Sequence, residues 1–287
     1  VLVMGDSFTF GDGVNEGEAF PQVADRASGT GNGAPWEVLD LGVSAWGPQN
    51  ALAYLETEGA PIQASCLIYT FFLGNDVMDN AASHLYSLRD GRLEKNPVVS
   101  APPSSADRVK GLMHALPFYD LLLDHSQIFN LIRAVFIGKT TDYRALADTY
   151  AEVPREAYVR ALDLNDATLA RMARIAQDRF GAFALILLPE LAQLDGAPDL
   201  HPSLELVPVD LAEEGRVRVK QWAQANSVPV LDLVELLPHD PAAARHLYFQ
   251  RDFHMNAAGH KRLGELLAQQ LPRLCDARHP PRQSAQG

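Results

Sequence analysis

The sequence predicts an α/β protein in which a parallel sheet is covered by helices on both faces. Short apolar runs typical of strands alternate with longer segments whose apolar residues recur at helical spacing. This alternation indicates parallel strands, because a crossover must return the chain to the start of the next strand. The run CLIYTFFL, at residues 66–73, is apolar almost throughout, as expected of a strand covered on both faces.

Five apolar runs are predicted to form the strands of this sheet. Glycine or proline closes several of them: the first ends at Gly5, the second at Gly42 and the fourth at Pro189. These two residue types interrupt regular structure and so mark the strand ends. In chain order the predicted strands are residues 1–4, 37–41, 66–73, 182–188 and 228–233.

Helical spacing predicts the helices between and after the strands. Pro21 and Pro48 each fall near a predicted helix start, where proline is tolerated because the first N–H groups have no intrahelical acceptor. Asn256 is predicted as the N-cap of the closing helix. The predicted helices are residues 18–27, 48–58, 156–180 and 257–271.

Residues 77–155 depart from this rhythm, because they are far longer than an ordinary connection. Residues 96–105 are rich in proline and serine and are predicted to be a loop, and residues 106–138 carry apolar residues at helical spacing. We interpret 77–155 as a helical insertion, either a scaffold elaboration at the sheet edge or a cap over the site. Residues 1–272 are then one domain with this insertion, and residues 273–287 are predicted to be a disordered tail.

Charge and composition argue against several classes of partner. The chain of 287 residues has a net charge of −12 and no run of basic residues, which argues against a nucleic-acid partner. It also has no run of about 18 apolar residues, so no transmembrane helix is predicted. The chain opens inside its first predicted strand, which suggests that the natural N-terminus lies upstream of Val1. The compartment therefore stays open between cytoplasm, periplasm and secretion, and the sequence does not indicate an oligomeric state.

The two cysteines are predicted to be free thiols. Cys66 lies in the third apolar run, and Cys275 lies in the predicted polar tail. Pairing is possible in principle, but a buried thiol and a tail thiol fit the pattern better. Neither cysteine has the spacing of a zinc ligand.

Polar residues follow the strands at the points where the strands end. The triplets GDS at 5–7, GVS at 42–44 and GND at 74–76 follow the first three strands, and RDFHMN at 251–256 precedes the closing helix. In a parallel sheet, ligands bind beyond the carboxyl ends of the strands. The three groups that follow strands are therefore expected to converge on one cleft.

The residue types in that cleft are those of nucleophilic catalysis. Ser7 can act as a nucleophile once a base removes its proton, and His254 can be that base. Asp252 can orient the imidazole and stabilise its positive charge if the backbone between the two bends. The backbone N–H groups of Ser7 and Gly42 and the side-chain amide of Asn75 are candidate donors to an oxyanion.

These residues also carry a family resemblance over nearly the whole chain. The four groups resemble, in order, the four sequence blocks of the SGNH hydrolases, also called GDSL-type esterases. FLGNDVMDN at 72–80 and DFHMNAAGH at 252–260 resemble the third and last blocks of one bacterial branch. Many members space the acid and the base by three residues, whereas the spacing here is two, as in that branch. The smallest members have no counterpart of the insertion at 77–155.

The resemblance implies a fold and a mechanism. The implied fold is a flavodoxin-like three-layer α/β/α sandwich with five parallel strands. The implied chemistry is ester hydrolysis through an acyl-enzyme, without metal or cofactor. Ser7 matches the family's nucleophile, Asp252 its acid and His254 its base. Gly42 and Asn75 match its oxyanion donors.

Three functional hypotheses follow from the sequence. The first is a serine esterase acting on short-chain acyl or acetyl esters of small molecules or glycans. The second is an acyltransferase or O-acetylesterase acting on polysaccharide with the same three residues. The third is a binding domain that keeps the fold without catalysis, against which the intact serine, histidine and aspartate argue.

Other interpretations of single residues are less well supported. A phosphate-binding loop would end in Gly-Lys-Ser or Gly-Lys-Thr, whereas GDG at 11–13 supplies an acid in place of the lysine. His260 is predicted to pack at a helix start rather than bind a metal, and His201 is the rival base. Asp6 and Asp76 are predicted to cap the segments that follow them. Trp46 either lines a pocket or packs locally.

Overall fold

A computed structural model of the chain describes residues 1–29, 36–57, 62–97, 153–195, 206–250 and 252–276. Its centre is a five-stranded sheet in the order β2-β1-β3-β6-β7, in which every neighbouring pair is parallel. This order places the early strands on one side of β3 and the late strands on the other, which is the doubly wound, flavodoxin-like arrangement. The strands are β1 (Leu2–Gly5), β2 (Leu39–Gly42), β3 (Leu67–Phe72), β6 (Phe183–Leu188) and β7 (Val230–Asp232).

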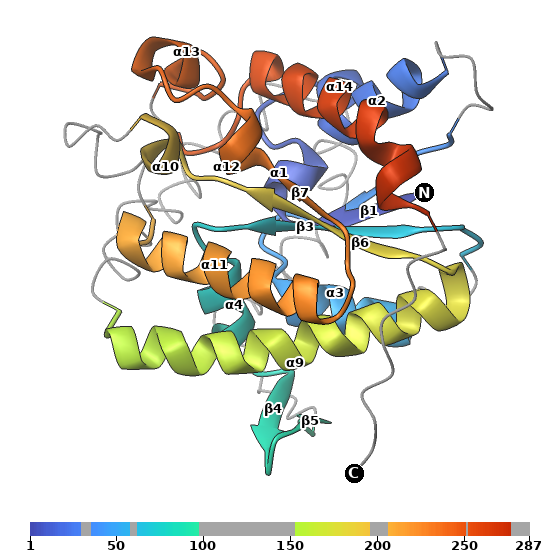
Figure 1. Ribbon diagram of the computed structural model, residues 1–287, viewed down its shortest axis with the longest axis vertical. Helices are drawn as coiled ribbons and strands as arrows, with labels where there is room; N and C mark the ends of the chain where they lie inside the picture. Colours follow the sequence, from blue (N-terminus) through green and yellow to red (C-terminus); the bar gives the residue numbers. More distant parts are fainter. Residues whose placement is uncertain (30–35, 58–61, 98–152, 196–205, 251, 277–287) are drawn as a thin grey trace, which may run out of the picture. The chain divides into compact units, whose positions relative to one another are not determined.

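Helices cover both faces of the sheet, so the predicted three-layer α/β/α sandwich is confirmed (Figure 1). One face carries α3 (Pro48–Glu56), α4 (Asp76–Ala82), α9 (Arg155–Phe180) and α11 (Val209–Ala225). The opposite face carries α2 (Phe20–Ser28) and α14 (Ala257–Leu274). The other helices of the described residues are short: α1 (Ser7–Phe10), η1 (Glu16–Glu18), α10 (Leu191–Asp195), α12 (Leu233–Leu236) and α13 (Pro241–Arg245).

The core is built on the two central strands. Every residue of β3 and of β6 is buried, as their apolar sequences predict for strands covered on both faces. The predicted N-cap also forms: the Asn256 side chain accepts hydrogen bonds from the N–H groups of Ala258 (2.9 Å) and Gly259 (3.2 Å). These contacts fix the point where α14 begins, directly after the loop that carries His254.

The described part of the predicted insertion differs from the sequence prediction. After α4 the chain forms an antiparallel hairpin of β4 (Tyr86–Arg89) and β5 (Arg92–Lys95). Asp90 and Gly91 at its turn have φ values of 49° and 73°, and two positive values are typical of a type I′ turn. Residues 98–152 lie outside the described residues, so the helical prediction for 106–138, the choice between cap and scaffold, and the single domain over 1–272 stay predictions.

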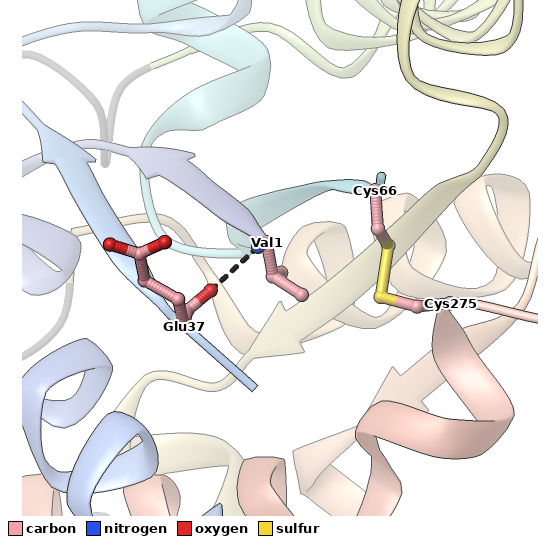
Figure 2. The surroundings of a disulfide bond; sticks show 4 residues. All are labelled: Val1, Glu37, Cys66 and Cys275. Atoms are coloured by element: carbon pink, nitrogen blue, oxygen red, sulfur yellow. Dashed lines mark hydrogen bonds between the residues drawn. A yellow bond between two sulfur atoms is a disulfide. The ribbon is translucent and has the colours of Figure 1, made fainter. Parts of the chain in front are cut away.

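The prediction of two free thiols is wrong, because Cys66 and Cys275 form a disulfide with their Cα atoms 5.5 Å apart. Figure 2 shows Cys66 at the start of β3 and Cys275 at the end of α14. Helix α14 continues to Leu274, beyond the predicted end at residue 271, and so brings Cys275 to the sheet. The first residues of the predicted tail are therefore ordered, and residues 277–287 lie outside the described residues.

One further difference concerns a helix. Helix α11 was not predicted from the sequence, although it is 17 residues long and packs beside α9. Within the described ranges, no helix combines the length and the apolar character that crossing a membrane would require.

Candidate active site

Ser7 lies where β1 ends and the short helix α1 begins. The Asp6 side chain accepts a hydrogen bond from the Phe8 N–H at 3.0 Å and caps α1, as predicted. A Cβ at Gly5 would lie 2.3 Å from Thr9 Oγ1, so only glycine lets α1 fold back against the end of the strand. This tight turn holds the Ser7 side chain at the carboxyl edge of the sheet.

The structure brings Ser7, His254 and Asp252 into one hydrogen-bonded line. His254 Nε2 lies 2.7 Å from Ser7 Oγ, and His254 Nδ1 lies 2.5 Å from Asp252 Oδ1. In the neutral tautomer that suits this arrangement, Nδ1–H donates to the carboxylate and Nε2 accepts from the serine hydroxyl. The three residues therefore have the geometry of a nucleophile, a base and an orienting acid.

The backbone bends at residue 253 so that one carboxylate oxygen serves two donors. Asp252 Oδ1 accepts from the His254 backbone N–H at 2.9 Å as well as from the ring. Partial burial opposes the charge on Asp252, but the hydrogen bonds from His254 outweigh it and lower the pKa of the carboxyl. Asp252 is therefore ionised when His254 would need a negative partner.

Aromatic side chains hold the His254 ring in place. The ring lies 4.9 Å from the Phe8 ring and stacks on the Phe253 ring at 4.2 Å, measured between centroids. His254 is only 4% exposed. The backbone is held as well, because the His254 carbonyl accepts from the Phe249 N–H at 3.0 Å. The base is thus fixed by packing and by backbone pairing, which limits its motion relative to Ser7.

Two buried carboxyl groups, Asp6 beside Ser7 and Asp76 beside Asn75 in the chain, interact with each other. Burial raises the pKa of Asp6 to about 7, although the Phe8 N–H and the charge of His254 lower it in part. Burial and the charges of Asp6 and Asp79 raise the pKa of Asp76 well above its usual range. The prediction that Asp76 caps the segment after it is wrong. Its Oδ2 points back to the strand and accepts from the Phe72 N–H at 3.0 Å.

The candidate oxyanion donors are placed unequally. The Ser7 N–H lies in the first turn of α1, where helical N–H groups lack an intrahelical acceptor. Asn75 lies between β3 and α4 and makes no side-chain capping bond to that helix. The Gly42 N–H, in contrast, donates to Asp40 Oδ1 at 2.7 Å.

The prediction that the Gly42 N–H is an oxyanion donor stays a prediction, and in this structure that N–H donates to Asp40 Oδ1. Glycine at position 42 is also required by the packing of the backbone. A Cβ there would lie 2.2 Å from the Phe10 nitrogen, so glycine lets α1 pack directly on the end of β2.

A broad hollow adjoins the acid of the line. It has a volume of about 530 Å³ and is lined by Gly13, Phe249, Gln250 and Asp252. Gly13 has a φ of 86°, and a Cβ there would lie 2.8 Å from the Phe249 ring, so this glycine admits the ring as a wall. Sequence reasoning missed Phe249 and Gln250, although they directly precede the block that contains Asp252 and His254.

The remaining predictions concern side chains around the site. His260 is buried, and its Nδ1 accepts from the Phe20 N–H at 3.2 Å. Burial and the charge of His254 lower the pKa of His260 to about 4, as suits a neutral packing residue. Trp46 packs locally against Tyr54, with ring centroids 5.7 Å apart. His201 lies outside the described residues, among which no three His, Cys, Asp or Glu side chains are grouped as metal ligands.

No protein-family model and no curated protein matches this chain. Solved structures are similar to it over most of both chains. They include a lipolytic protein of the G-D-S-L family from Desulfitobacterium hafniense DCB-2, with 16% identity over 93% of this chain and 97% of that one and a TM-score of 0.48. A member of the same family from Veillonella parvula DSM 2008 has 14% identity over 94% and 96% of the chains and a TM-score of 0.43.

A third similar structure is Est24, a carbohydrate acetylesterase from Sinorhizobium meliloti, with 12% identity over 95% of this chain and 98% of that one and a TM-score of 0.47. Because all three TM-scores are below 0.5, the roles of Ser7, His254 and Asp252 rest on their own geometry.

Proposed function

We propose that this chain is a serine esterase that hydrolyses carboxylic esters through an acyl-enzyme. The observation that carries the proposal is the line from Ser7 Oγ to His254 to Asp252, with contacts of 2.7 and 2.5 Å. A serine hydroxyl is a weak nucleophile by itself, and this line supplies the base and the acid that activate it.

In the first step, Ser7 Oγ attacks the carbonyl carbon of the ester while His254 Nε2 takes the hydroxyl proton. The carbonyl π electrons move onto oxygen, which becomes an oxyanion. The imidazolium that forms is stabilised by Asp252, which its lowered pKa keeps ionised. His254 is almost fully buried, so this electrostatic stabilisation is stronger than it would be in water.

The oxyanion is stabilised by the Ser7 N–H and the Asn75 side-chain amide. Each such donor contributes about 3–4 kcal/mol to transition-state stabilisation in comparable sites. Collapse of the tetrahedral intermediate breaks the bond to the alcohol oxygen, which takes the proton from His254 Nε2. Water then attacks the acyl-enzyme by the same path, giving the free acid and restoring Ser7.

The surroundings of the site favour a small acyl group and allow a large alcohol. Ser7 is 8% exposed, which favours acyl groups as short as acetyl. The hollow beside Asp252 is broad, and the Phe249 ring and the Gln250 amide offer it both an apolar and a polar wall. A sugar alcohol presents both kinds of surface, so we propose acetylated glycans or similar small esters as the substrate class.

The test is Ser7→Ala, assayed on p-nitrophenyl acetate beside the wild-type protein. The variant keeps the fold and loses the nucleophile, so we expect hydrolysis to fall by a factor of at least about 10³. A fluorophosphonate probe should label the wild-type protein and not the variant. Equal hydrolysis by purified, folded Ser7→Ala would overturn the proposal.

A second candidate is acyl transfer with the same residues. The same hollow that would hold the alcohol of a substrate could hold an acceptor hydroxyl, which would attack the acyl-enzyme in place of water. The products separate the two functions: an acetylated glycan formed from p-nitrophenyl acetate and a glycan acceptor indicates transfer, and free acetate alone indicates hydrolysis.

A further inference from the structure

Glu190 is a buried acidic side chain that the proposed mechanism does not use. It follows Pro189 at the carboxyl end of β6 and is 1% exposed. A buried carboxylate is costly unless hydrogen bonds compensate the loss of water. The presence of this buried carboxyl group at the same edge of the sheet as the site therefore calls for an explanation.

Glu190 occupies the space that a side chain at Gly74 would take. An ideal Cβ at Gly74 would lie 2.3 Å from Glu190 Oε1 and 2.7 Å from its Cγ. The two segments are adjacent because β3 pairs with β6, and the pairing continues beyond both strands through a bond of 2.9 Å from the Leu73 N–H to the Leu188 carbonyl. The carboxylate thus lies against the backbone that leads directly into Asn75.

Two hydrogen bonds also fix this carboxylate. Glu190 Oε1 accepts from the N–H groups of Leu206 (3.2 Å) and Val207 (3.1 Å), just before α11 begins. The Glu190 N–H itself donates to Gln193 Oε1 at 3.1 Å. Because both its backbone and its carboxylate are held by hydrogen bonds, the Glu190 side chain packs in one fixed position against Gly74.

The same segment also touches the part of the chain that carries the base. The Tyr248 hydroxyl donates to the Pro189 carbonyl at 2.8 Å. Burial and the charge of Glu190 raise the pKa of Tyr248 well above its usual value, which keeps it a donor. Tyr248 is bridged to Met255, the residue after His254. Residues 189–190 therefore contact the neighbour of Asn75 on one side and the His254 loop on the other.

We propose that Glu190 is a positioning residue that sets the place of Asn75 relative to Ser7 through its contact with Gly74. The inference rests on the proposed function, because it assumes that the Asn75 amide acts on an oxyanion. Loss of the carboxylate would leave a space beside the Gly74 Cα and leave two buried N–H groups without their acceptor. The Gly74–Asn75 backbone could then move, and a small displacement of a preorganised donor is costly to catalysis.

A double-mutant cycle between Glu190 and Asn75 tests this role. Glu190→Ala should lower kcat on p-nitrophenyl acetate by about 10- to 100-fold with little change in KM, because an oxyanion donor acts in the transition state. In an Asn75→Ala background the same change should cost less than about threefold, since the donor it positions is gone. Glu190→Gln keeps the shape and an acceptor oxygen and should retain kcat within about threefold.

Asp232→Ala is the matched control, because Asp232 is also a buried carboxylate at a strand end but pairs with Arg216 instead of contacting Gly74. It should lower the melting temperature without the loss of kcat. An equal loss of kcat from Glu190→Ala with and without Asn75, or the same loss in Asp232→Ala, would reduce Glu190 to a structural residue and overturn the inference.

A readout that needs no turnover separates this inference from the proposed function. The Asn75 side-chain amide resonances, assigned from their absence in Asn75→Ala, should shift or broaden in Glu190→Ala and stay in place in Glu190→Gln and Asp232→Ala. If the wild-type protein showed no hydrolysis that depends on Ser7, the esterase proposal would fail and the NMR result would still stand. If the Asn75 resonances did not move in Glu190→Ala, the positioning role would be rejected and the esterase proposal would still stand.

Discussion

At the scale of the residue, two different signals predicted that Ser7, His254 and Asp252 meet. Ser7 stands at a strand end, where parallel strands bring ligand-binding residues together, and Asp252 and His254 were joined to it by their residue types and by the resemblance of their block. The partner of the Gly42 N–H could not be predicted in the same way. It depends on the rotamer of Asp40, two residues earlier, whose carboxylate reaches its own backbone, and no sequence pattern separates that local bond from a free donor.

Asp6 gives a prediction about pH at this scale. Its pKa is about 7 in the folded protein and about 4 in an unfolded chain. The folded state therefore binds the proton more strongly, and the stability that this proton supplies is lost as the pH rises from about 4 to about 7. Asp6→Asn keeps the acceptor for the Phe8 N–H and cannot ionise.

We therefore expect the free energy of unfolding of the wild-type protein to fall between pH 5 and pH 8, relative to Asp6→Asn, by roughly 1–4 kcal/mol. Urea unfolding at both pH values measures this difference. Because Asp76, Asp79 and His254 also face this region, the comparison must be made between the two proteins at each pH. Parallel pH dependence of wild type and variant would show that Asp6 does not titrate in this range.

At the scale of the element, strands were easier to predict than the pieces between them. The apolar runs, closed for example by Gly5 or Pro189, predicted the ends of each strand of the sheet to within a few residues. Burial on both faces leaves a strong apolar pattern. The hairpin of β4 and β5 was missed although its turn, Asp90-Gly91, carries a clear signal. Helix α11 was missed because polar residues interrupt its apolar face, and packing against α9 supplies stability that a sequence pattern does not display.

Gly42→Ala tests how closely α1 must pack on β2. The added Cβ would lie 2.2 Å from the Phe10 nitrogen and 2.5 Å from the Thr9 carbonyl carbon, so backbone rather than a flexible side chain must move. We expect the change to destabilise the protein by about 2 kcal/mol or more, as overpacking commonly does, and to lower esterase activity by displacing the helix that begins at Ser7. Thermal unfolding and p-nitrophenyl acetate hydrolysis measure the two effects.

Gly17→Ala is the control for this change, because the nearest atom to its Cβ would be the end of the Arg26 side chain at 3.9 Å. It should leave both stability and activity nearly unchanged. If Gly42→Ala behaved like Gly17→Ala, the close approach of α1 to β2 would not constrain the site.

At the scale of the whole molecule, one end of the sheet carries the candidate site and the other end carries the disulfide. The candidate site lies at the carboxyl edge, beyond β1 and β3. The disulfide between Cys66 and Cys275 lies at the opposite end of β3, where it fastens the residue directly after α14 to the sheet (Figure 2). The pairing of two cysteines 209 residues apart could not be predicted from their spacing, because it depends on how far α14 continues and where it ends.

Breaking this disulfide should therefore change stability and leave catalysis intact. A link across so long a loop restricts the unfolded chain strongly, and its loss should cost about 3–5 kcal/mol in the free energy of unfolding. A reductant should lower the melting temperature of the wild-type protein, while Cys66→Ala/Cys275→Ala should start from the lower value and not respond to reductant. At 25 °C the folded variant should keep kcat within about twofold, because Cys66 is separated from Ser7 by the length of β3. A loss of kcat in the folded variant that matches its loss of stability would show instead that the far end of the sheet controls the geometry of the site.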